Sequence, residues 1–302
     1  MQGAGRCRTQ GAVGILPCFD MHSSDTLAVP AGPSQAGAAH PFDQAIRLEP
    51  DGEGRMGGAT HPEYWNQVGP FGGITAAVML ESVLRQPQRL GDPLSLTVNY
   101  AGPVREGGFV IETKLVRSNR TTQHWSMELV QGPGREVAIS AIAVFALRRD
   151  TFSLTEASPP PAPPAAQCHR VRGRTDLPWL AHYDMRYVRG KPMHENEDSV
   201  THLWVGDLPP RPLDFPSLAA ICDVFFPRLF LRRPKFVPIG TVSLNVYFHL
   251  GGEAIARHGA HHVLASAHGQ VVSAGFFDQQ GQVWSHDGQL LATTHQIVWF
   301  KE

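Results

Sequence analysis

The sequence has few cysteines and no long apolar run, and each shortage excludes a class of protein. Its 302 residues include 4 cysteines. They show no CxxC spacing, which argues against a disulfide scaffold, a zinc ribbon and a thioredoxin-type redox site. No run approaches the ~18 apolar residues of a membrane span. The 26 basic and 27 acidic residues give a formal net charge of −1, which does not suit general nucleic-acid binding. We expect a cytoplasmic protein with no membrane span and no nucleic-acid partner.

Several motifs of common enzymes are also missing. The sequence contains no GxSxG nucleophile elbow, no GxxxxGK[ST] phosphate loop and no HExxH zinc motif. A formal GxGxxG occurs at residues 52–57, but Gly58 and Pro62 follow where a helix should run, so it is interpreted as a flexible loop. The histidines at 258, 261 and 262 lack a carboxylate or cysteine at metal-ligand spacing. We expect no metal and no cofactor.

Low-complexity segments divide the chain. Residues 1–40 are rich in Gly, Ala, Ser and Pro and are interpreted as a disordered tail or as the product of an overlong gene model, with Met21 as an alternative start. Residues 156–167 (EASPPPAPPAAQ) form a Pro/Ala linker, because five prolines forbid helix and sheet. The linker separates two segments, 41–155 and 168–302, each long enough for one domain.

The two segments follow a similar pattern. The first predicts a helix over 71–85 and then strands over 95–101, 109–117, 122–130 and 137–147. The second predicts two strands (182–188, 200–205), a helix over 215–231, and strands over 241–248, 262–270, 271–278 and 290–300. The strands that follow the helices match in letters, SLTVNY at 95–100 against SLNVYF at 243–248. The pattern predicts an α+β protein of two units, each a long apolar helix wrapped by an antiparallel β-sheet.

Asp223 is anomalous within the second predicted helix. The segment AAICDVFF around it is apolar, and no cation stands three or four residues away. A buried carboxylate without a partner is costly and tends to have a raised pKa. We interpret Asp223 as functional, although a helix-end or surface position is the alternative. The adjacent Cys222 is interpreted as a small core residue.

These residues carry a resemblance. The second segment resembles the C-terminal half of the double-hotdog acyl-CoA thioesterases, the thioesterase II type of the thioesterase-like superfamily. The similarity rests on Cys222-Asp223, on IGT at 239–241 leading into VYFH at 246–249, and on DG at 287–288 followed by ATTHQ at 292–296. The first segment resembles the family's N-terminal hotdog through FGG at 71–73 and the later strands. The resemblance implies a double hotdog in which Asp223, Thr241 and Gln296 hold and activate a water.

The internal repeat gives a separate comparison of the two halves. The offset of the matched strands places Thr75 opposite Asp223 and Pro93 opposite Thr241. Aligning the last strands places Ile142 opposite Gln296. The first half therefore offers no acid and no amide at these places, as expected of a duplicated unit with one surviving site.

The expected activity is hydrolysis of a fatty or related acyl-CoA, a reaction of lipid metabolism in which coenzyme A is part of the substrate. Asp223 would take the water's proton, and Thr241 and Gln296 would hold the water. Helix N-terminal amides around Gly72 and Gly73 would face the thioester oxygen, or these glycines only permit tight packing. The basic residues Arg228, Arg232 and Arg233 suit coenzyme A phosphates, or form a solvated helix end.

Two other functions stay open. A hotdog enoyl-CoA hydratase would need a D-x4-H pair beside a central helix, and neither helix has one. A non-catalytic acyl-CoA-binding hotdog protein would need no Asp-Thr-Gln set. Double-hotdog protomers could also assemble into a homo-oligomer.

Overall fold

The structure is a computed structural model that describes residues 39–171 and 176–302. Residues 1–38, most of the predicted tail, lie outside the described residues. His40, the last residue of that predicted tail, belongs to the fold, because its ring nitrogen accepts a hydrogen bond from the Phe42 N–H at the start of α1. In chain order the helices are α1 Pro41–Ala45, η1 Pro62–Tyr64, α2 Gly72–Leu84, η2 Ala165–Gln167, η3 Pro178–His182, α3 Phe215–Ile221, α4 Leu229–Arg232 and α5 Gly252–Arg257.

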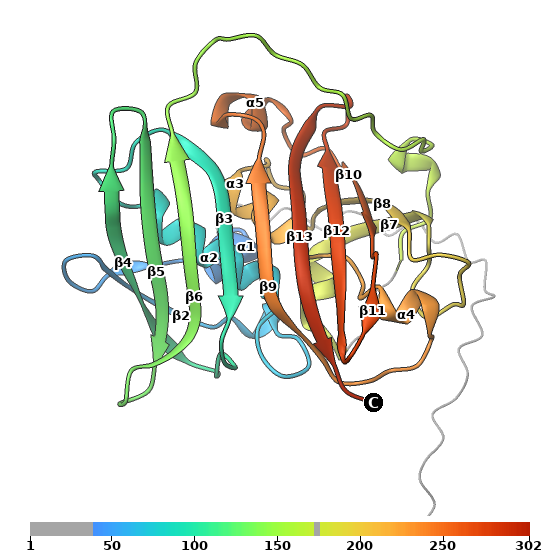
Figure 1. Cartoon of the computed structure of the whole chain (residues 1–302), viewed down its shortest axis with the longest axis horizontal. Coiled ribbons are helices and arrows are strands. Elements are labelled where there is room, and N and C mark those ends of the chain that lie inside the picture. The colour runs from blue at the N-terminus through green and yellow to red at the C-terminus, as the bar shows by residue number, and fades with distance from the viewer. Residues whose placement is uncertain (1–38, 172–175) are drawn as a thin grey trace, which may run out of the picture. The chain divides into compact units, whose positions relative to one another are not determined.

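The strands form one antiparallel sheet (Figure 1). Their order is β1-β2-β4-β5-β6-β3-β9-β13-β12-β10-β8-β7, with β11 paired to β12. The bounds are β1 Glu49–Pro50, β2 Arg55–Ala59, β3 Asp92–Tyr100, β4 Gly108–Ser118, β5 Thr122–Gln131, β6 Glu136–Ala146, β7 Tyr183–Arg189, β8 Thr201–Asp207, β9 Ile239–Phe248, β10 Val263–His268, β11 Val272–Ser273, β12 Phe276–Trp284 and β13 Leu290–Phe300. Strands β1–β6 come from the first half of the chain and β7–β13 from the second, so the halves meet where β3 pairs with β9.

The register of β3 against β9 reflects the internal repeat. Thr97 lies directly opposite Asn245, its own counterpart at the repeat offset, and donates a hydrogen bond from Oγ1 to Asn245 Oδ1 at 2.7 Å. Leu96 pairs with Val246 and Val98 with Leu244. A residue that faces its own counterpart marks a two-fold axis. The two halves are therefore related by a pseudo-two-fold axis through this pair.

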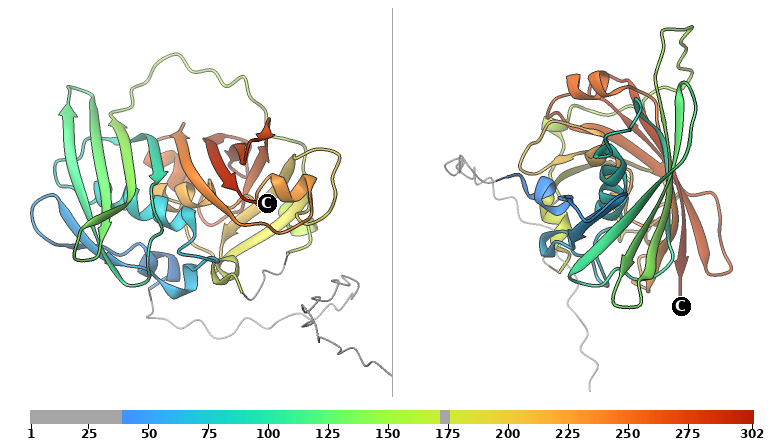
Figure 2. Two further views of the ribbon diagram at one scale, coloured as in Figure 1. Left: turned by 60° about the horizontal axis from the view of Figure 1, so that its bottom comes forward. Right: turned by 90° about the vertical axis from the view of Figure 1, so that its left-hand side faces the viewer.

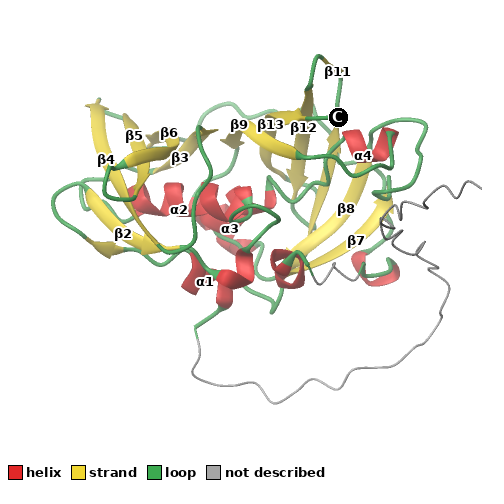
Figure 3. Ribbon diagram, turned by 90° about the horizontal axis from the view of Figure 1, so that it is seen from below, coloured by secondary structure: helices red, strands yellow, loops and turns green. Residues whose placement is uncertain are grey.

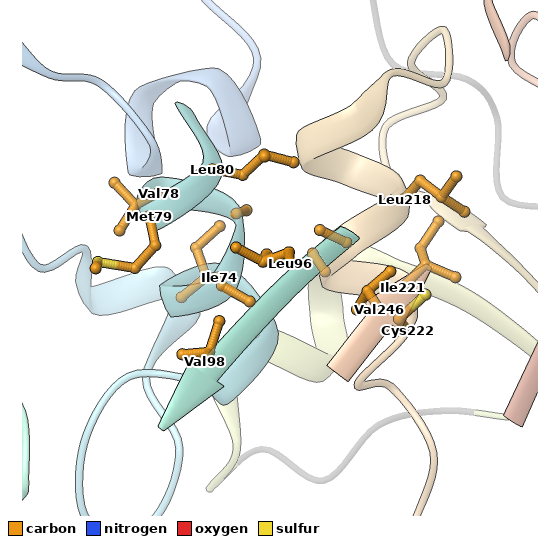
Figure 4. Packing of buried hydrophobic residues seen from close by; sticks show 14 of the residues in the cluster. Ile74, Val78, Met79, Leu80, Leu96, Val98, Leu218, Ile221, Cys222 and Val246 are labelled. Atoms are coloured by element: carbon orange, nitrogen blue, oxygen red, sulfur yellow. The ribbon is translucent and has the colours of Figure 1, made fainter. Parts of the chain in front are cut away.

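The helix α2 is buried on nearly all sides, by the sheet and by the neighbouring helix α3. Ten of its side chains or glycine positions are buried, including Ile74, Val78, Met79 and Leu80. Figure 2 shows the sheet curving around α2 on its concave side, and Figure 3 shows α3 on the same side beside it. The two helices pack against Leu96, Val98 and Val246 of the junction strands (Figure 4). The architecture is the α+β double hotdog expected from the pattern of a lone apolar helix and a meander.

Three local expectations are wrong. Of residues 52–57, expected to be a flexible loop, Arg55 onward belongs to the strand β2, and a Cβ at Gly58 in that strand would lie 2.7 Å from the Phe109 ring. The strand expected over 271–278 is a hairpin, because Ala274 and Gly275 take positive φ values of 52° and 80° and reverse the chain. The long second helix expected over 215–231 is broken between Ile221 and Leu229.

The Pro/Ala segment 156–167 contains no strand, as its prolines predict, and only the short η2 at its end. It forms part of the arch that joins β6 to the second half in Figure 1. Its end packs on that half: Trp204 Nε1 donates to the carbonyl of Pro163 at 2.8 Å. Ala162 and Ala165 contact a small cluster that includes Trp204 and Trp284. No described helix is long and apolar enough to cross a membrane.

Candidate active site

Asp223 follows the end of a helix, contrary to the sequence-based expectation that it lies inside one. Helix α3 ends at Ile221 with Cys222 as its C-cap, and the Asp223 N–H donates to Ala220 O at 3.0 Å. Pro227 prevents a continuous helix from α3 to α4, because it lacks an N–H and disfavours a helical conformation at the residue before it. The turn aims the Asp223 carboxylate away from α3 and towards the first half of the protein.

The carboxylate meets the N-terminus of α2. Phe71, the N-cap of this helix, makes no side-chain hydrogen bond to the free N–H groups of the first turn. The Gly73 N–H instead donates to the Asp223 carboxylate. Gly72 makes the approach possible, because a Cβ there would lie 2.6 Å from Asp223 Oδ2. A helix N-terminus favours a negative charge, so the first half supplies the binding site for the acid of the second half.

Gln296 holds the other side of the carboxylate. It projects from the inner face of β13, is 3% exposed, and donates from Nε2 to Asp223 Oδ1 at 2.7 Å. The same nitrogen approaches Cys222 O at 3.4 Å. Because the carboxylate only accepts, the amide nitrogen must face it. Among residues 39–171 and 176–302, none donates a hydrogen bond to the Gln296 carbonyl oxygen, and Gln296 lines the pocket.

Thr241 lies on β9 and lines the same pocket as Asp223 and Gln296. It pairs with Val298 of β13, and a bulge at Val242 separates it from the regular part of the strand. No direct hydrogen bond connects its hydroxyl to Asp223 or Gln296 among the described residues. The three predicted residues therefore share one cavity, in which a direct contact joins two of them.

The pocket has a volume of about 280 Å³. Its polar lining includes Thr75, Tyr100 and Gln279 besides the three residues above. Its apolar lining comes from both halves and includes Phe71, Val104, Ile139, Leu177, Trp179, Val224, Phe225, Phe226, Phe230, Phe236, Ile239 and Val298. Such a concave, mostly apolar site with a few convergent polar groups is typical of a small-molecule site.

The surroundings of Asp223 change its acidity. Burial raises its pKa to about 7, and the hydrogen bonds from Gln296 and Gly73 oppose that rise. Asp223 is partly exposed because it lines the pocket. Its carboxylate oxygens nevertheless lie against Gly72 and Gln296. Asp223 also contributes to the raised pKa of Tyr100, whose first cause is burial. A carboxylate with a pKa near neutrality is suited to proton transfer.

Two residues of the site were missed by sequence reasoning. Tyr100 donates from its hydroxyl to the Gly72 carbonyl at 2.7 Å, which fixes the first turn of α2 against β3. Gln279 is 2% exposed on the inner face of β12, directly opposite Gln296. The alternation of buried and more exposed residues along β12 could have identified Gln279, because it places this amide among inward-facing apolar residues. The strand was instead expected over 271–278, so this alternation was not recognised.

The predicted basic cluster separates into buried and exposed members. Arg228 is fully buried, and its guanidinium donates to the carbonyls of Phe226 and Ser199 and to the side chains of Gln279 and Thr201. The expectation that Arg228 binds coenzyme A phosphates is therefore wrong. Burial lowers its pKa to about 10.

Arg232 and Arg233 are exposed at the end of α4. Arg232 donates to the Asn196 carbonyl at 3.2 Å, and Arg233 pairs with Glu302. Neither residue lines the pocket. They are the exposed cations of this cluster.

The sheet register corrects one comparison of the halves. Leu244 pairs with Gln296, and its counterpart Leu96 pairs with Ala143. The first-half counterpart of Gln296 is thus Ala143, which is buried, and the expectation of Ile142 is wrong by one residue. That slip matters because neighbouring strand residues face opposite sides, and Ile142 is 57% exposed. The counterpart of Thr241 is Pro93, as expected, since both flank a bulge at the same place.

No cluster of three or more His, Cys, Asp or Glu side chains that suits a metal ion occurs in residues 39–171 and 176–302. His261 and His286 stack on each other near α5, His258 contacts both rings at a steeper angle, and none of the three lines the pocket.

Comparisons with known proteins agree with this geometry. Residues 61–146 match the model of the acyl-CoA thioesterase N-terminal domain, and residues 155–300 match that of the C-terminal domain. A hot dog fold protein of unknown function from Alicyclobacillus acidocaldarius is 47% identical, with a TM-score of 0.85 over 88% of this chain and 99% of that one. No curated protein matches the sequence significantly.

More distant solved structures share the fold. The acyl-CoA thioesterase II TesB2 from Mycobacterium marinum is 18% identical, with a TM-score of 0.69 over 86% of this chain and 98% of that one. The tesB protein from Mycobacterium avium subs paratuberculosis is 16% identical, with the same TM-score and the same coverage. The two family matches and the double-hotdog architecture together show that the chain belongs to the acyl-CoA thioesterase family and is a thioester hydrolase.

Proposed function

We propose that the protein hydrolyses fatty or related acyl-CoA thioesters with a water activated by Asp223, Thr241 and Gln296. The observation that carries this proposal is the 2.7 Å contact of Gln296 with Asp223, within a pocket that Thr241 also lines. The catalytic residues all come from the second half, for which we propose the boundaries 168–302, with 41–155 as the first hotdog domain. The first half contributes the α2 N-terminus that binds the Asp223 carboxylate.

Asp223 has the properties of a general base. Its pKa of about 7 makes it a stronger base than an ordinary carboxylate and leaves it largely ionised slightly above neutral pH. Gly73 and Gln296 occupy part of its acceptor capacity, and the rest faces the pocket. The Gln296 carbonyl oxygen and the Thr241 hydroxyl can each bind a water that also contacts Asp223.

The reaction then follows simply. The oxygen of the bound water attacks the thioester carbonyl carbon while Asp223 takes one of its protons. The carbonyl oxygen becomes an oxyanion in the tetrahedral intermediate. When the intermediate collapses, the carbon–sulfur bond breaks, its electron pair goes to sulfur, and the proton held by Asp223 passes to that sulfur. The products are a free carboxylic acid and coenzyme A with a free thiol.

The lining of the pocket suits the two parts of the substrate. The acyl group would contact the phenylalanines of 225–230, whose burial against an acyl chain is favourable by about 25 cal/mol per Å². Arg232 and Arg233 would contact coenzyme A phosphates outside the pocket. The mechanism requires no cofactor beyond the coenzyme A of the substrate. A cytoplasmic role in lipid metabolism and assembly into a homo-oligomer are further parts of this proposal.

A panel of acyl-CoAs tests the proposal, with release of free thiol as the measurement. We expect turnover by the full chain and loss of turnover in Asp223→Asn. A hydratase would instead add water to an enoyl-CoA without releasing thiol. A binding protein would bind acyl-CoA in a titration and release none, and either result would overturn the proposal.

A further inference from the structure

Gln279 is a buried amide that the mechanism above does not use. It lies on the inner face of β12 directly opposite Gln296 on β13, and both residues line the pocket. Arg228 Nε donates to Gln279 Oε1 at 2.9 Å. A guanidinium has donors only, so it fixes which end of the amide faces it. The Gln279 nitrogen must point away from Arg228.

That nitrogen has no hydrogen-bond partner among the described residues. That atom is not completely buried, and Gln279 lines the pocket. Gln296 cannot play the same part, because its nitrogen contacts Asp223 and Cys222. The pocket therefore receives two free N–H donors from Gln279.

The first half of the repeat lacks this arrangement. The counterparts of Gln279 and Gln296 in the sheet register are Trp125 and Ala143, which pair directly across β5 and β6. Both are buried, at 1% exposed each. A hotdog sheet can thus fill these two inward positions with apolar side chains. The polar pair occurs in the half that carries Asp223, which links it to the site.

The spacing suits the reaction. Residues directly opposite in an antiparallel pair have Cβ atoms ~4.5–5.5 Å apart, so Gln279 lies about one side chain beyond the amide that holds Asp223. A water bound to Asp223 would place its oxygen ~3 Å from the carbonyl carbon of the thioester. The distance from the Asp223 carboxylate to the carbonyl oxygen of the thioester is then roughly 5–7 Å, which is similar to the separation of Gln296 and Gln279. The carbonyl oxygen would then face Gln279.

We infer that Gln279 is a catalytic residue that donates hydrogen bonds to the thioester carbonyl oxygen and to the oxyanion formed from it, and that Arg228 is its positioning residue. This inference rests on the proposed thioester hydrolysis. A preorganised donor in a water-poor site stabilises the charge that develops in the transition state. The buried Arg228 also places positive charge one residue away from that oxyanion.

Two substitutions of Gln279 test the inference in the full chain. Gln279→Glu keeps the shape and the contact with Arg228 but removes the N–H donors and adds a negative charge. Gln279→Met keeps the length and is neutral. We expect Gln279→Met to lower kcat by about 10²–10³-fold and Gln279→Glu to lower it at least as much, with KM little changed. The melting temperature of Gln279→Glu should not fall, because the new carboxylate pairs with Arg228.

Gln280→Met is the matched control. Gln280 is the next residue of β12, half-buried, and lies on the opposite face of the sheet, away from the pocket. It should retain the kcat of the wild type. Values of kcat within about threefold of the wild type in both Gln279 variants would overturn the inference. So would a loss confined to 3-hydroxyacyl-CoAs, because Gln279 would then recognise the acyl chain.

Asp223→Asn, measured beside these variants, separates the two proposals. If Asp223→Asn is inactive and the Gln279 variants are active, only the inference on Gln279 fails. If Asp223→Asn keeps its activity, the proposed base fails. Arg228→Lys tests positioning: it should lower kcat in the wild type but add nothing in Gln279→Met. A purely structural role of Arg228 would lower kcat by the same factor in both backgrounds.

Discussion

The backbone N–H of Gly73, in the first half of the chain, donates a hydrogen bond to the carboxylate of Asp223, in the second half. The acid is thus held between two units that the repeat relates by a pseudo-two-fold axis. Each unit supplies what the other lacks: the first a helix N-terminus without its own cap, the second a charged side chain. The site therefore depends on the pairing of the halves.

The glycine at the start of α2 should control the position of this carboxylate. In Gly72→Ala the new Cβ would lie 2.6 Å from Asp223 Oδ2 and 3.3 Å from Tyr100 Oη, so the carboxylate must move. We expect kcat to fall by about 10–10²-fold, while thermal unfolding changes little because alanine favours a helix. Gly108→Ala is the control, since its nearest neighbour lies 3.8 Å away. Unchanged kcat in Gly72→Ala would contradict this placement of Asp223.

The raised pKa of Asp223 should make the protein less stable as the pH rises. The pKa is about 7 in the folded protein and about 3.9 in an unfolded chain. Between these values the folded state keeps a proton that the unfolded state releases, so stability falls with rising pH. Asp223→Asn removes this loss. Its stabilisation should grow from about pH 4 to pH 7 and level off at about 2–4 kcal/mol.

Asp207 provides a comparison for that experiment. Burial raises its pKa to about 6, its Oδ2 accepts from the Ser217 hydroxyl at 2.7 Å, and it does not line the pocket. Asp207→Asn should also stabilise the protein, by an amount that grows from about pH 4 to pH 6 and then levels off, with unchanged kcat. Chemical denaturation at several pH values measures both effects. A gain for Asp223→Asn that does not depend on pH would show that burial of charge is not its cause.

Thr241 and Gln296 should act through the same water as Asp223. Thr241→Val and Gln296→Ala each leave one side chain that can hold the water, so each should lose less than Asp223→Asn. Adding either change to Asp223→Asn should lower kcat little further, because residues that act as a unit are not additive. Steady-state thiol release from the single and double variants measures this. Multiplicative losses would mean that the residues act at separate steps.

The isolated halves should not be stable monomers. Separation exposes the edges of β3 and β9, five residue pairs of sheet, and the faces of α2 and α3 that pack together. Exposed edges and apolar faces drive association. Residues 41–155 and 168–302, expressed separately, should aggregate or self-associate in size-exclusion chromatography. A monomeric half with native-like dispersion of its proton NMR signals would contradict the shared core.

The helices and strands could be predicted where the sequence pattern of a segment matches the way that segment packs in the fold. Helix α2 and strand β13 lie within a residue or two of their expected bounds, because a fully apolar helix and an alternating strand are unambiguous signals. The match between residues 95–100 and 243–248 predicted the internal repeat, and the structure shows that the two matched strands, β3 and β9, pair with each other. Asp223 could be predicted as functional because burying a carboxylate without a partner in an apolar segment costs free energy.

The rest depended on contacts distant in sequence. The helix expected over 215–231 stops at Ile221, and only the folded structure shows that this turn sends Asp223 to the α2 N-terminus. Arg228 looked like a surface cation, because its partners Ser199, Thr201 and Gln279 lie far away in the sequence. No periodicity distinguishes such a buried guanidinium from an exposed one.

The pH dependence of kcat in Asp223→Asn tests the central claim most directly. In the wild type, kcat for a saturated acyl-CoA should rise through about pH 7 and then reach a plateau, since the base must be ionised. In Asp223→Asn the plateau should be lower by about 10²–10⁴-fold, and the step near pH 7 should be absent. A variant with the wild-type kcat and the same step would contradict the role of Asp223 as the base.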